Sequence, residues 1–216
     1  MSGPEEPRPP LRRTGWPLSP HRLLGTIPGM TSEGAATWEI AEDPAEVHDL
    51  LCACDAWQAE ATGTPVPRRR YASTERWVRA GAVHLLREHG RAVAMFTLSE
   101  VPPFDLRATP YGPARYPLYL QRLAVTPELL RTGSVLGAQC VRRAVTVARR
   151  RQADVLRAEA NPDLRATREL LRVLGFVQLG DIRQDDTGRR WVYLERPLVA
   201  GRPGTTDVTG NEITKP

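Results

Sequence analysis

A glycine-containing turn before a helix is the segment of this sequence best suited to bind a phosphorylated ligand. Residues 123–125 have the composition of a strand, residues 127–132 follow as a loop, and residues 133–138 open a helix. Free N–H groups at a helix N-terminus point outward with the positive end of the helix dipole behind them, and glycine allows phosphates to approach closely. The turn therefore predicts a pyrophosphate site, although two glycines near a helix start more often serve the turn alone.

The three cysteines, Cys52, Cys54 and Cys140, form the pattern of neither a metal site nor a disulfide framework. Residues two positions apart on a helix point to opposite sides, and no further Cys or His is suitably spaced. We therefore predict buried small side chains and no metal site. An odd number of cysteines, two of them in a helical stretch, favours a reducing, cytoplasmic environment.

Arginine-rich stretches and a formal net charge of +5 raise the question of an anionic partner. Arg68-Arg69-Arg70 are suited to an acidic substrate or to a cofactor phosphate, and Arg142 or Arg143 could reach the same phosphate. A solvated surface is the more frequent role of such residues. A nucleic-acid-binding protein would show steeply salt-dependent affinity for DNA, but no recognition motif is present, so we do not expect nucleic acid as the partner.

Alternating strand and helix patterns between residues 35 and 199 predict one domain. The expected elements are a strand at 36–40, a helix capped by Asp43 with Pro44 at its first position, a short helix from Ser73 to Ala80, a hairpin of residues 83–87 and 92–98, a proline-rich loop to residue 117, a strand at 118–125, the helix after the glycine turn, a strand at 155–158, a helix started by Asn161-Pro162 and ended by Gly175, and strands at 177–179 and 191–194.

The two ends of the chain differ in composition from the part between them. Residues 1–34 are rich in proline with little apolar periodicity, and residues 200–216 are similarly loose, so we predict disordered tails. Met30 is a candidate second translation start, which mass spectrometry of native protein would test. No apolar run is long enough to cross a bilayer, and none follows the N-terminal arginines, so we expect neither a transmembrane helix nor a secretory signal.

Several ordered segments together resemble the GNAT superfamily of N-acetyltransferases. They are residues 119–127, the glycine turn, the helix that carries Ala144 and Ala148, and Leu174-Gly175-Phe176. The resemblance covers residues 36–198 in the family's order of elements and is strongest over 118–180. It implies an α/β (α+β) fold with a mixed, mostly antiparallel central sheet flanked by helices.

The resemblance also implies where acetyl-CoA and its amine acceptor bind. Main-chain groups of Leu123, Ala124 and Val125 would bind the pantetheine arm like an added strand. The residues implied at the pyrophosphate are Arg131, Thr132, Gly133, Ser134, Val135, Leu136, Gly137 and Ala138. The amine would approach across strands 118–125 and 155–160 and attack the thioester carbonyl directly, which requires orientation, proton removal and oxyanion stabilisation.

Two features of the family's usual pattern are missing. In register with Gly137, Thr132 and Val135 stand where the family has Arg or Gln and a glycine, and Arg131 is a candidate substitute in charge. The helix tyrosine that usually precedes the Gly-Phe pair is Leu171. The family's usual general acid is therefore absent from its usual place.

Four residues are candidates to carry the proton transfers instead. Tyr119 and Gln121 are expected on the same strand face as Leu123, because side chains alternate along a strand. Glu100, after the preceding strand, could deprotonate the amine through a water, and Tyr193 on the last strand could protonate the departing thiolate. A tyrosine in a strand is, however, more often a core residue with a satisfied hydroxyl.

We expect an acyl-CoA-dependent N-acyltransferase, most simply an acetyltransferase, that acts on a small-molecule or peptide amine as a monomer or homodimer. The alternatives are a GNAT-like module that binds acyl-CoA or a partner protein without turnover, and an enzyme of this fold that uses a longer acyl group. Loop 101–117 lies where substrate-shaping loops lie in the family, and its aromatic residues Phe104, Tyr111 and Tyr116 either form a lid or simply pack.

Overall fold

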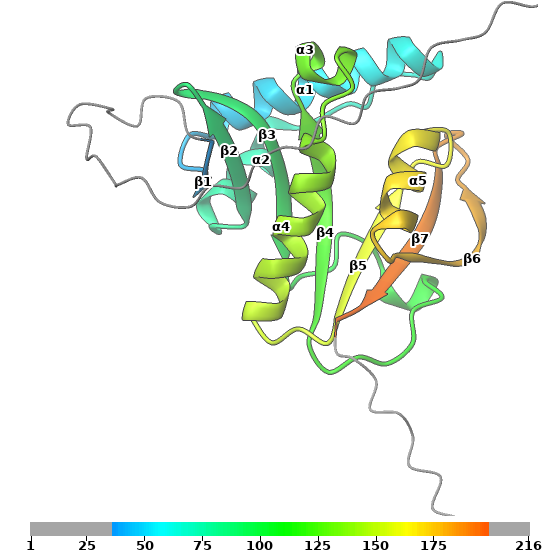
Figure 1. Cartoon of the computed structure of the whole chain (residues 1–216). Helices are drawn as coiled ribbons and strands as arrows, with labels where there is room; N and C mark the ends of the chain where they lie inside the picture. Colours follow the sequence, from blue (N-terminus) through cyan, green and yellow to red (C-terminus); the bar gives the residue numbers. More distant parts are fainter. Residues whose placement is uncertain (1–35, 199–216) are drawn as a thin grey trace, which may run out of the picture. The chain divides into compact units, whose positions relative to one another are not determined.

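The computed structural model describes residues 36–198. A seven-stranded sheet forms its middle layer, in the order β1-β2-β3-β4-β5-β7-β6 (Figure 1). The strands are β1 (Thr37–Ile40), β2 (Val83–Glu88), β3 (Arg91–Ser99), β4 (Pro117–Val125), β5 (Val155–Ala160), β6 (Val177–Gln184) and β7 (Arg190–Pro197). Only β4 and β5 pair in parallel among the described strands, which confirms the mixed, mostly antiparallel sheet.

Helices cover both faces of the sheet (Figure 1). They are α1 (Pro44–Thr62), α2 (Tyr71–Arg79), the 3-10 helix η1 (Leu106–Ala108), α3 (Pro127–Arg131), α4 (Leu136–Arg150) and α5 (Arg165–Val173). One core cluster joins α4 and α5 to the sheet through residues such as Phe96, Leu120 and Val141. A second joins α1 and α2 to the opposite face through Leu51 and Met95. We call these two sides of the sheet the α4 face and the α1 face.

The start of α1 and the first hairpin follow from local sequence, as predicted. The carboxylate of Asp43 accepts a hydrogen bond from the Ala45 amide at 2.8 Å, and Pro44 occupies the first helical position. Strands β2 and β3 pair through a turn in which His89 and Gly90 both have positive φ. Such turn conformations match the twist of an antiparallel hairpin.

The segment 127–132, which we predicted to be a loop, is mostly helical. Pro127 occupies the first position of α3 and Glu128 lies in its first turn, and both residue types favour a helix start. Gly133 then ends the segment with φ of 70°. The prediction was wrong because this helix is too short to show any apolar periodicity.

Two further boundaries were also predicted wrongly. The helix expected at Asn161 begins at Arg165, because the Asn161 side chain accepts a hydrogen bond from the Asp163 amide at 2.9 Å and closes a turn. Strand β6 extends to Gln184 because its pairing with β7 resumes at Arg183 after an irregularity.

A β-bulge in β4 interrupts the alternation of side chains along this strand. Arg122 has φ of 54°, and the register with β3 shifts between the pairs Thr97↔Gln121 and Met95↔Ala124. Two residues of β4 therefore oppose one residue of β3, which bends the strand and increases its twist.

The bulge separates residues that we expected on one face. Tyr119 and Gln121 lie on the α1 face, because they pair with Ser99 and Thr97 on the side of β3 that carries Met95. Leu123 instead packs against the core cluster of the α4 face. The prediction that Leu123 shares a face with Tyr119 and Gln121 was wrong because simple alternation stops at the bulge.

None of the helices between residues 36 and 198 combines the length and the hydropathy that crossing a membrane requires. The predictions of disordered tails at 1–34 and 200–216, and of a start at Met30, lie outside the described residues.

Candidate active site

The parallel strands β4 and β5 separate along their length. Their registered pairs run from Pro117↔Val155 to Leu120↔Ala158 and stop there. Residues 121–125 of β4 therefore have no registered partner in β5, and their main-chain groups on that side form an open strand edge. An extended ligand can bind such an edge through main-chain hydrogen bonds.

The turn between α3 and α4 follows this open edge in the chain, separated from it by the short helix α3. The amides of Gly133 and Ser134 donate to the carbonyls of Leu130 and Leu129 at 3.2 and 3.1 Å, so these amides close the end of α3. The Leu136 amide donates to the Ser134 hydroxyl at 3.2 Å. Only part of the predicted set 132–138 is therefore available to a ligand.

Three amides remain available at the start of α4. Those of Val135, Gly137 and Ala138 donate to no residue between 36 and 198. Unpaired amides at the start of a helix with 15 residues form a site for an anion.

The two glycines of the turn each have a structural role. Gly133 adopts a positive φ that side-chain-bearing residues rarely take, and its added Cβ would meet no atom within 4 Å. A Cβ on Gly137 would lie 3.3 Å from Leu170 Cδ2, so this glycine lets α4 approach α5 closely. The glycines therefore shape and position the start of α4.

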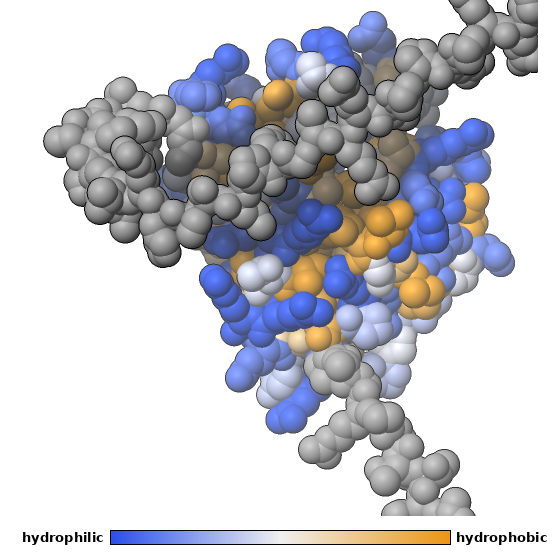
Figure 2. Space-filling model, viewed as in Figure 1, coloured by the Kyte–Doolittle hydropathy of each residue, from blue (hydrophilic) through white to orange (hydrophobic). Residues whose placement is uncertain are grey.

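The side chains of the turn leave the anion site open. Val135 is 65% exposed, and Arg131 and Thr132 are also exposed, so none of them fills the space in front of the helix. Leu136 is buried and anchors α4 in the core of the α4 face. Hydrophobic residues reach the surface among hydrophilic ones on the face of the molecule that Figure 2 shows.

Two of the predicted catalytic residues lie on the α1 face, in the two strands that flank β5: Tyr119 in β4 and Tyr193 in β7. Tyr119 pairs with Arg157 of β5, which is still within the paired part of the strands, and Tyr193 pairs with Glu159, close to where β4 and β5 separate. Both tyrosines are buried and both contact Phe104 edge-on, with ring centroids 5.7 and 5.6 Å apart.

The other two predicted catalytic residues are Gln121, which follows the last residue of β4 that pairs with β5, and Glu100, which follows the end of β3. The Gln121 amide donates to the Ser99 hydroxyl at 3.1 Å, which in turn donates to the Val101 carbonyl at 2.8 Å. Glu100, between these partners, is exposed. Gln121 therefore fixes the end of β3, and Glu100 follows Ser99, the partner of Tyr119, so it lies beside the paired part of β4 rather than beside the open edge.

Loop 101–117 packs against the α1 face of β5 and β7. The Tyr111 hydroxyl donates to the carbonyls of Ala158 and Leu194 at 2.8 and 3.2 Å. The buried Arg157 guanidinium pairs with Glu195 at 2.8 Å and donates to the Gly112 carbonyl at 2.5 Å. Phe104 and Tyr111 are thus packed side chains that shape this face.

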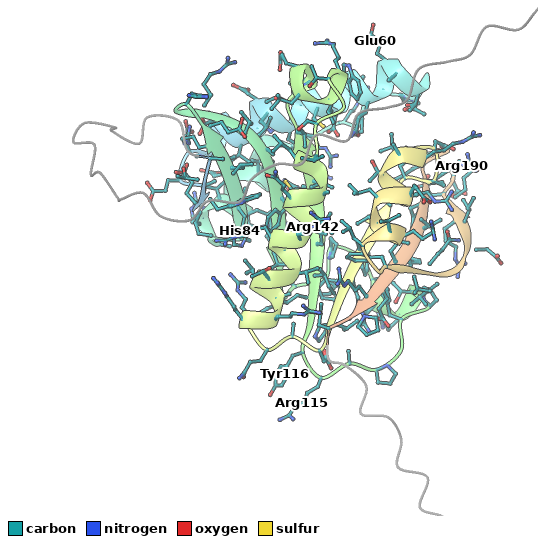
Figure 3. All side chains as sticks on the ribbon, in the orientation of Figure 1. Glu60, His84, Arg115, Tyr116, Arg142 and Arg190 are labelled. Atoms are coloured by element: carbon teal, nitrogen blue, oxygen red, sulfur yellow. The ribbon has the colours of Figure 1, made fainter. Side chains whose placement is uncertain are left out.

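Tyr116 does not join these aromatic residues. It is exposed beside Arg115, whose guanidinium lies 5.0 Å from its ring, where the loop leads into β4 (Figure 3). This position is at the other end of β4 from the open edge.

Glu159 is a candidate catalytic residue that the sequence analysis missed. It follows the last paired residue of β5, and it lies beside Tyr193 because directly opposed residues share a face. Burial raises the pKa of its carboxyl, against the effect of the Arg189 guanidinium at 2.8 Å. The only available signal was its position in the predicted strand 155–160, where strand alternation places it on the face of Arg157.

The cysteines and most of the arginines have other roles. Cys140 is buried in the core of the α4 face, where burial raises the pKa of its thiol to about 12 and leaves it protonated at neutral pH. Cys54 is also buried, and no group of metal-ligating side chains occurs between residues 36 and 198. Arg142 is exposed on α4 (Figure 3), whereas Arg69 forms a bidentate pair with the buried Asp55.

Comparisons with known proteins give structural matches only, since the sequence matches no family model and no curated protein. The protein YncA from Salmonella typhimurium, described as an acetyltransferase and solved with its cofactor acetyl-CoA, is 18% identical, with a TM-score of 0.56 over 80% of this chain and 99% of that one. The ribosomal-protein-S18-alanine N-acetyltransferase from Escherichia coli is 17% identical, with a TM-score of 0.56 over 78% and 98%.

A GNAT-family acetyltransferase from Streptococcus agalactiae is 14% identical, with a TM-score of 0.59 over 75% of this chain and 95% of that one. The described domain therefore has the fold of GNAT acetyltransferases, as the resemblance implied. At these identities the likeness establishes the fold alone.

Proposed function

We propose that this protein is an acyl-CoA-dependent N-acyltransferase that transfers an acetyl group to an amine. The observation that carries the proposal is the combination of an open β4 edge with unpaired amides at the start of α4. The edge would hold the pantetheine arm through the main chain of residues 123–125. The amides of Val135, Gly137 and Ala138 would hold the pyrophosphate.

Glu159 and Tyr193 are suited to the two proton transfers of this reaction. The amine nitrogen forms a bond to the thioester carbonyl carbon, the C–S bond breaks, and the amine loses a proton. A half-buried carboxylate with a raised pKa is a better proton acceptor near neutral pH than a free one. We propose that Glu159 accepts the proton of the amine and that Tyr193, beside it, protonates the thiolate.

The other predicted residues have supporting parts in this proposal. Gln121 holds the segment of Glu100, which remains an alternative base through a water. Tyr119 is 1% exposed and lies within the paired part of β4 and β5, which suits a role in shaping the site. We place the activity in the cytoplasm, which the three free cysteines fit.

A non-catalytic acyl-CoA-binding module is the second candidate, and one observation favours it. Leu171 occupies the place of the family's usual tyrosine, and it is buried in the core of the α4 face. A leucine side chain has no proton to donate, so it cannot replace this acid. The module would bind coenzyme A without turning over any amine.

Calorimetry with acetyl-CoA, followed by mass detection of products from a panel of amines, tests the proposal. Ala138→Pro removes one amide at the third position of α4, where no bond within the helix is lost, and should weaken acetyl-CoA binding about tenfold. Ala166→Pro, at the second position of α5, is the matched control and should leave binding unchanged.

Three outcomes separate the candidates. Binding with product formation supports the enzyme, and the product mass distinguishes an acetyl from a longer acyl group. Binding without turnover of any amine supports the module. Absence of binding by folded protein refutes both.

A further inference from the structure

Arg122, at the bulge of β4, has a charged group whose contacts are hydroxyls. Its guanidinium donates to the Ser73 hydroxyl at 2.7 Å and to the Thr74 hydroxyl at 3.4 Å. The ion pairs formed within residues 36–198 do not include Arg122. Half-buried guanidinium groups normally have a carboxylate partner, so its absence here points to a partner that binds from outside.

The surroundings of Arg122 carry an excess of positive charge. Burial, the largest cause, and the neighbouring Arg69 and Arg76 together lower the pKa of Arg122 to about 10, and the opposing effect of Asp55 is smaller. Asp55 is the nearby carboxylate, but Arg69 already binds both of its oxygens, at 2.5 and 3.1 Å. An incoming anion would therefore reduce the repulsion among these cations and take up the remaining N–H donors of Arg122.

Arg122 also lies where the acceptor would approach. Its side chain reaches α2, which covers the α1 face, and its main chain lies in the open edge, two residues after Leu120, the last residue of β4 that pairs with β5. Glu159 stands on the same face, on the β5 side of the point where the strands separate. The first turn of α2, which contains Ser73, adds the positive end of a helix dipole.

We propose that the acyl acceptor is an amine that also carries a carboxylate, and that Arg122 binds this carboxylate against Ser73 while the amine faces Glu159. This inference rests on the proposed function, because it names the substrate class of the same site. A guanidinium and a hydroxyl on one side, with a carboxylate base on the other, hold an amino acid by its two opposite charges. Amines of the same size that carry no carboxylate cannot form the contact with Arg122 and Ser73.

A purely structural role for Arg122 makes a different prediction. If the side chain only ties β4 to α2 through Ser73 and Thr74, acidic and neutral acceptors should react equally well in the unmodified protein. Loss of the guanidinium would then lower stability without changing the choice of acceptor.

Matched pairs of acceptors test the proposal. Glycine, β-alanine and γ-aminobutyrate are each compared with their own carboxamide, with rates corrected for the fraction of free amine. We expect at least one acid to exceed its amide in kcat/KM by about 10- to 100-fold, as for a charge-assisted hydrogen bond. Arg122→Met should abolish this preference through KM, and Arg122→Lys should keep part of it.

Arg91→Met is the matched control, since Arg91 is exposed at the start of β3. This variant should prefer each acid over its amide by the same factor as the unmodified chain. Affinity for acetyl-CoA, measured by calorimetry, should be the same in all four proteins. Equal rates for every acid and its amide, or a preference that survives in a folded Arg122→Met, would overturn the proposal.

A binding experiment decides the question independently of turnover. N-acetyl-β-alanine and N-acetyl-β-alaninamide are titrated into the unmodified protein saturated with coenzyme A. Binding of the acid alone, and its loss in Arg122→Met, supports the inference, and equal affinity or absence of acid binding contradicts it. Failure of the proposed function is recognised separately, by the absence of coenzyme A binding.

Discussion

At the scale of single residues, the proposed chemistry depends most on Glu159. Its carboxyl is half-buried on the α1 face, beside Tyr193 and within 2.8 Å of the Arg189 guanidinium. Burial and the nearby guanidinium shift its pKa in opposite directions, and burial has the larger effect. This balance sets the pH below which Glu159 is protonated and can no longer act as a base.

We predict that Glu159→Gln lowers kcat about 100- to 1000-fold, because the amide cannot accept a proton. Affinity for acetyl-CoA should stay the same, since Glu159 lies on the α1 face away from the start of α4. Single-turnover rates with saturating acetyl-CoA measure the effect. An unchanged rate would assign the base to another residue, with Glu100 as the next candidate.

The pH dependence should move when Arg189 is removed. A base must be deprotonated, so kcat/KM falls as the pH drops through the pKa of Glu159. Arg189 lowers this pKa, hence Arg189→Met should raise it and shift the acid limb of the profile to higher pH. Arg183→Met, exposed on β6, is the control and should leave the limb in place. An acid limb that moves to lower pH, or does not move, in Arg189→Met would exclude Glu159 as the titrating group.

At the scale of elements, the contact between α4 and α5 positions the anion site. Gly137 lies in the first turn of α4, and any side chain there would meet Leu170 of α5. The amides proposed for the pyrophosphate lie on the same turn, so the packing of the two helices and the binding of the ligand are coupled.

Gly137→Val should therefore reduce both stability and ligand affinity. The added methyl groups overpack the helix contact, and we expect a loss of about 1–3 kcal/mol in the free energy of unfolding. Urea unfolding measures this loss, and calorimetry should show weaker acetyl-CoA binding. Gly112→Val is the control, because a Cβ on Gly112 meets no atom within 4 Å. Equal behaviour of the two variants would show that α4 and α5 have room to move apart.

The loop that covers β5 and β7 depends on hydrogen bonds from Tyr111. Tyr111→Phe removes the donor to the Ala158 and Leu194 carbonyls and should lower the free energy of unfolding by about 1–2 kcal/mol. Hydrogen exchange should become faster in residues 101–117. Tyr116→Phe, exposed and without a hydrogen bond from its hydroxyl to residues 36–198, should change neither measurement.

At the scale of the whole molecule, ligand binding should be visible as stabilisation. A ligand that binds only the folded state, at roughly 100 times its Kd, adds about 2.7 kcal/mol to the free energy of unfolding. For a domain of this size, acetyl-CoA should raise Tm by about 5–10 °C. The increase should grow with ligand concentration and be smaller in Ala138→Pro. A constant Tm across acetyl-CoA concentrations would contradict coenzyme A binding.

The order of elements could be predicted from the sequence because its signals are local. The Asp43-Pro44 start of α1, the β2–β3 hairpin and the end of α5 at Gly175 depend on residues within a few positions of each other. The glycine turn likewise marked the start of α4. Local signals failed where the element was short, as in α3, or where a side chain closed its own turn, as at Asn161.

The composition of the site was decided by tertiary structure. The bulge at Arg122 arises from the pairing of β4 with β3, and it determines that Leu123 turns toward α4 while Gln121 faces α1. Glu159 becomes a candidate base because β4 leaves β5 just before it and because β7 brings Tyr193 and Arg189 alongside. These contacts join residues far apart in the chain, so the sequence by itself determined which residues could do chemistry, and folding determined which of them meet.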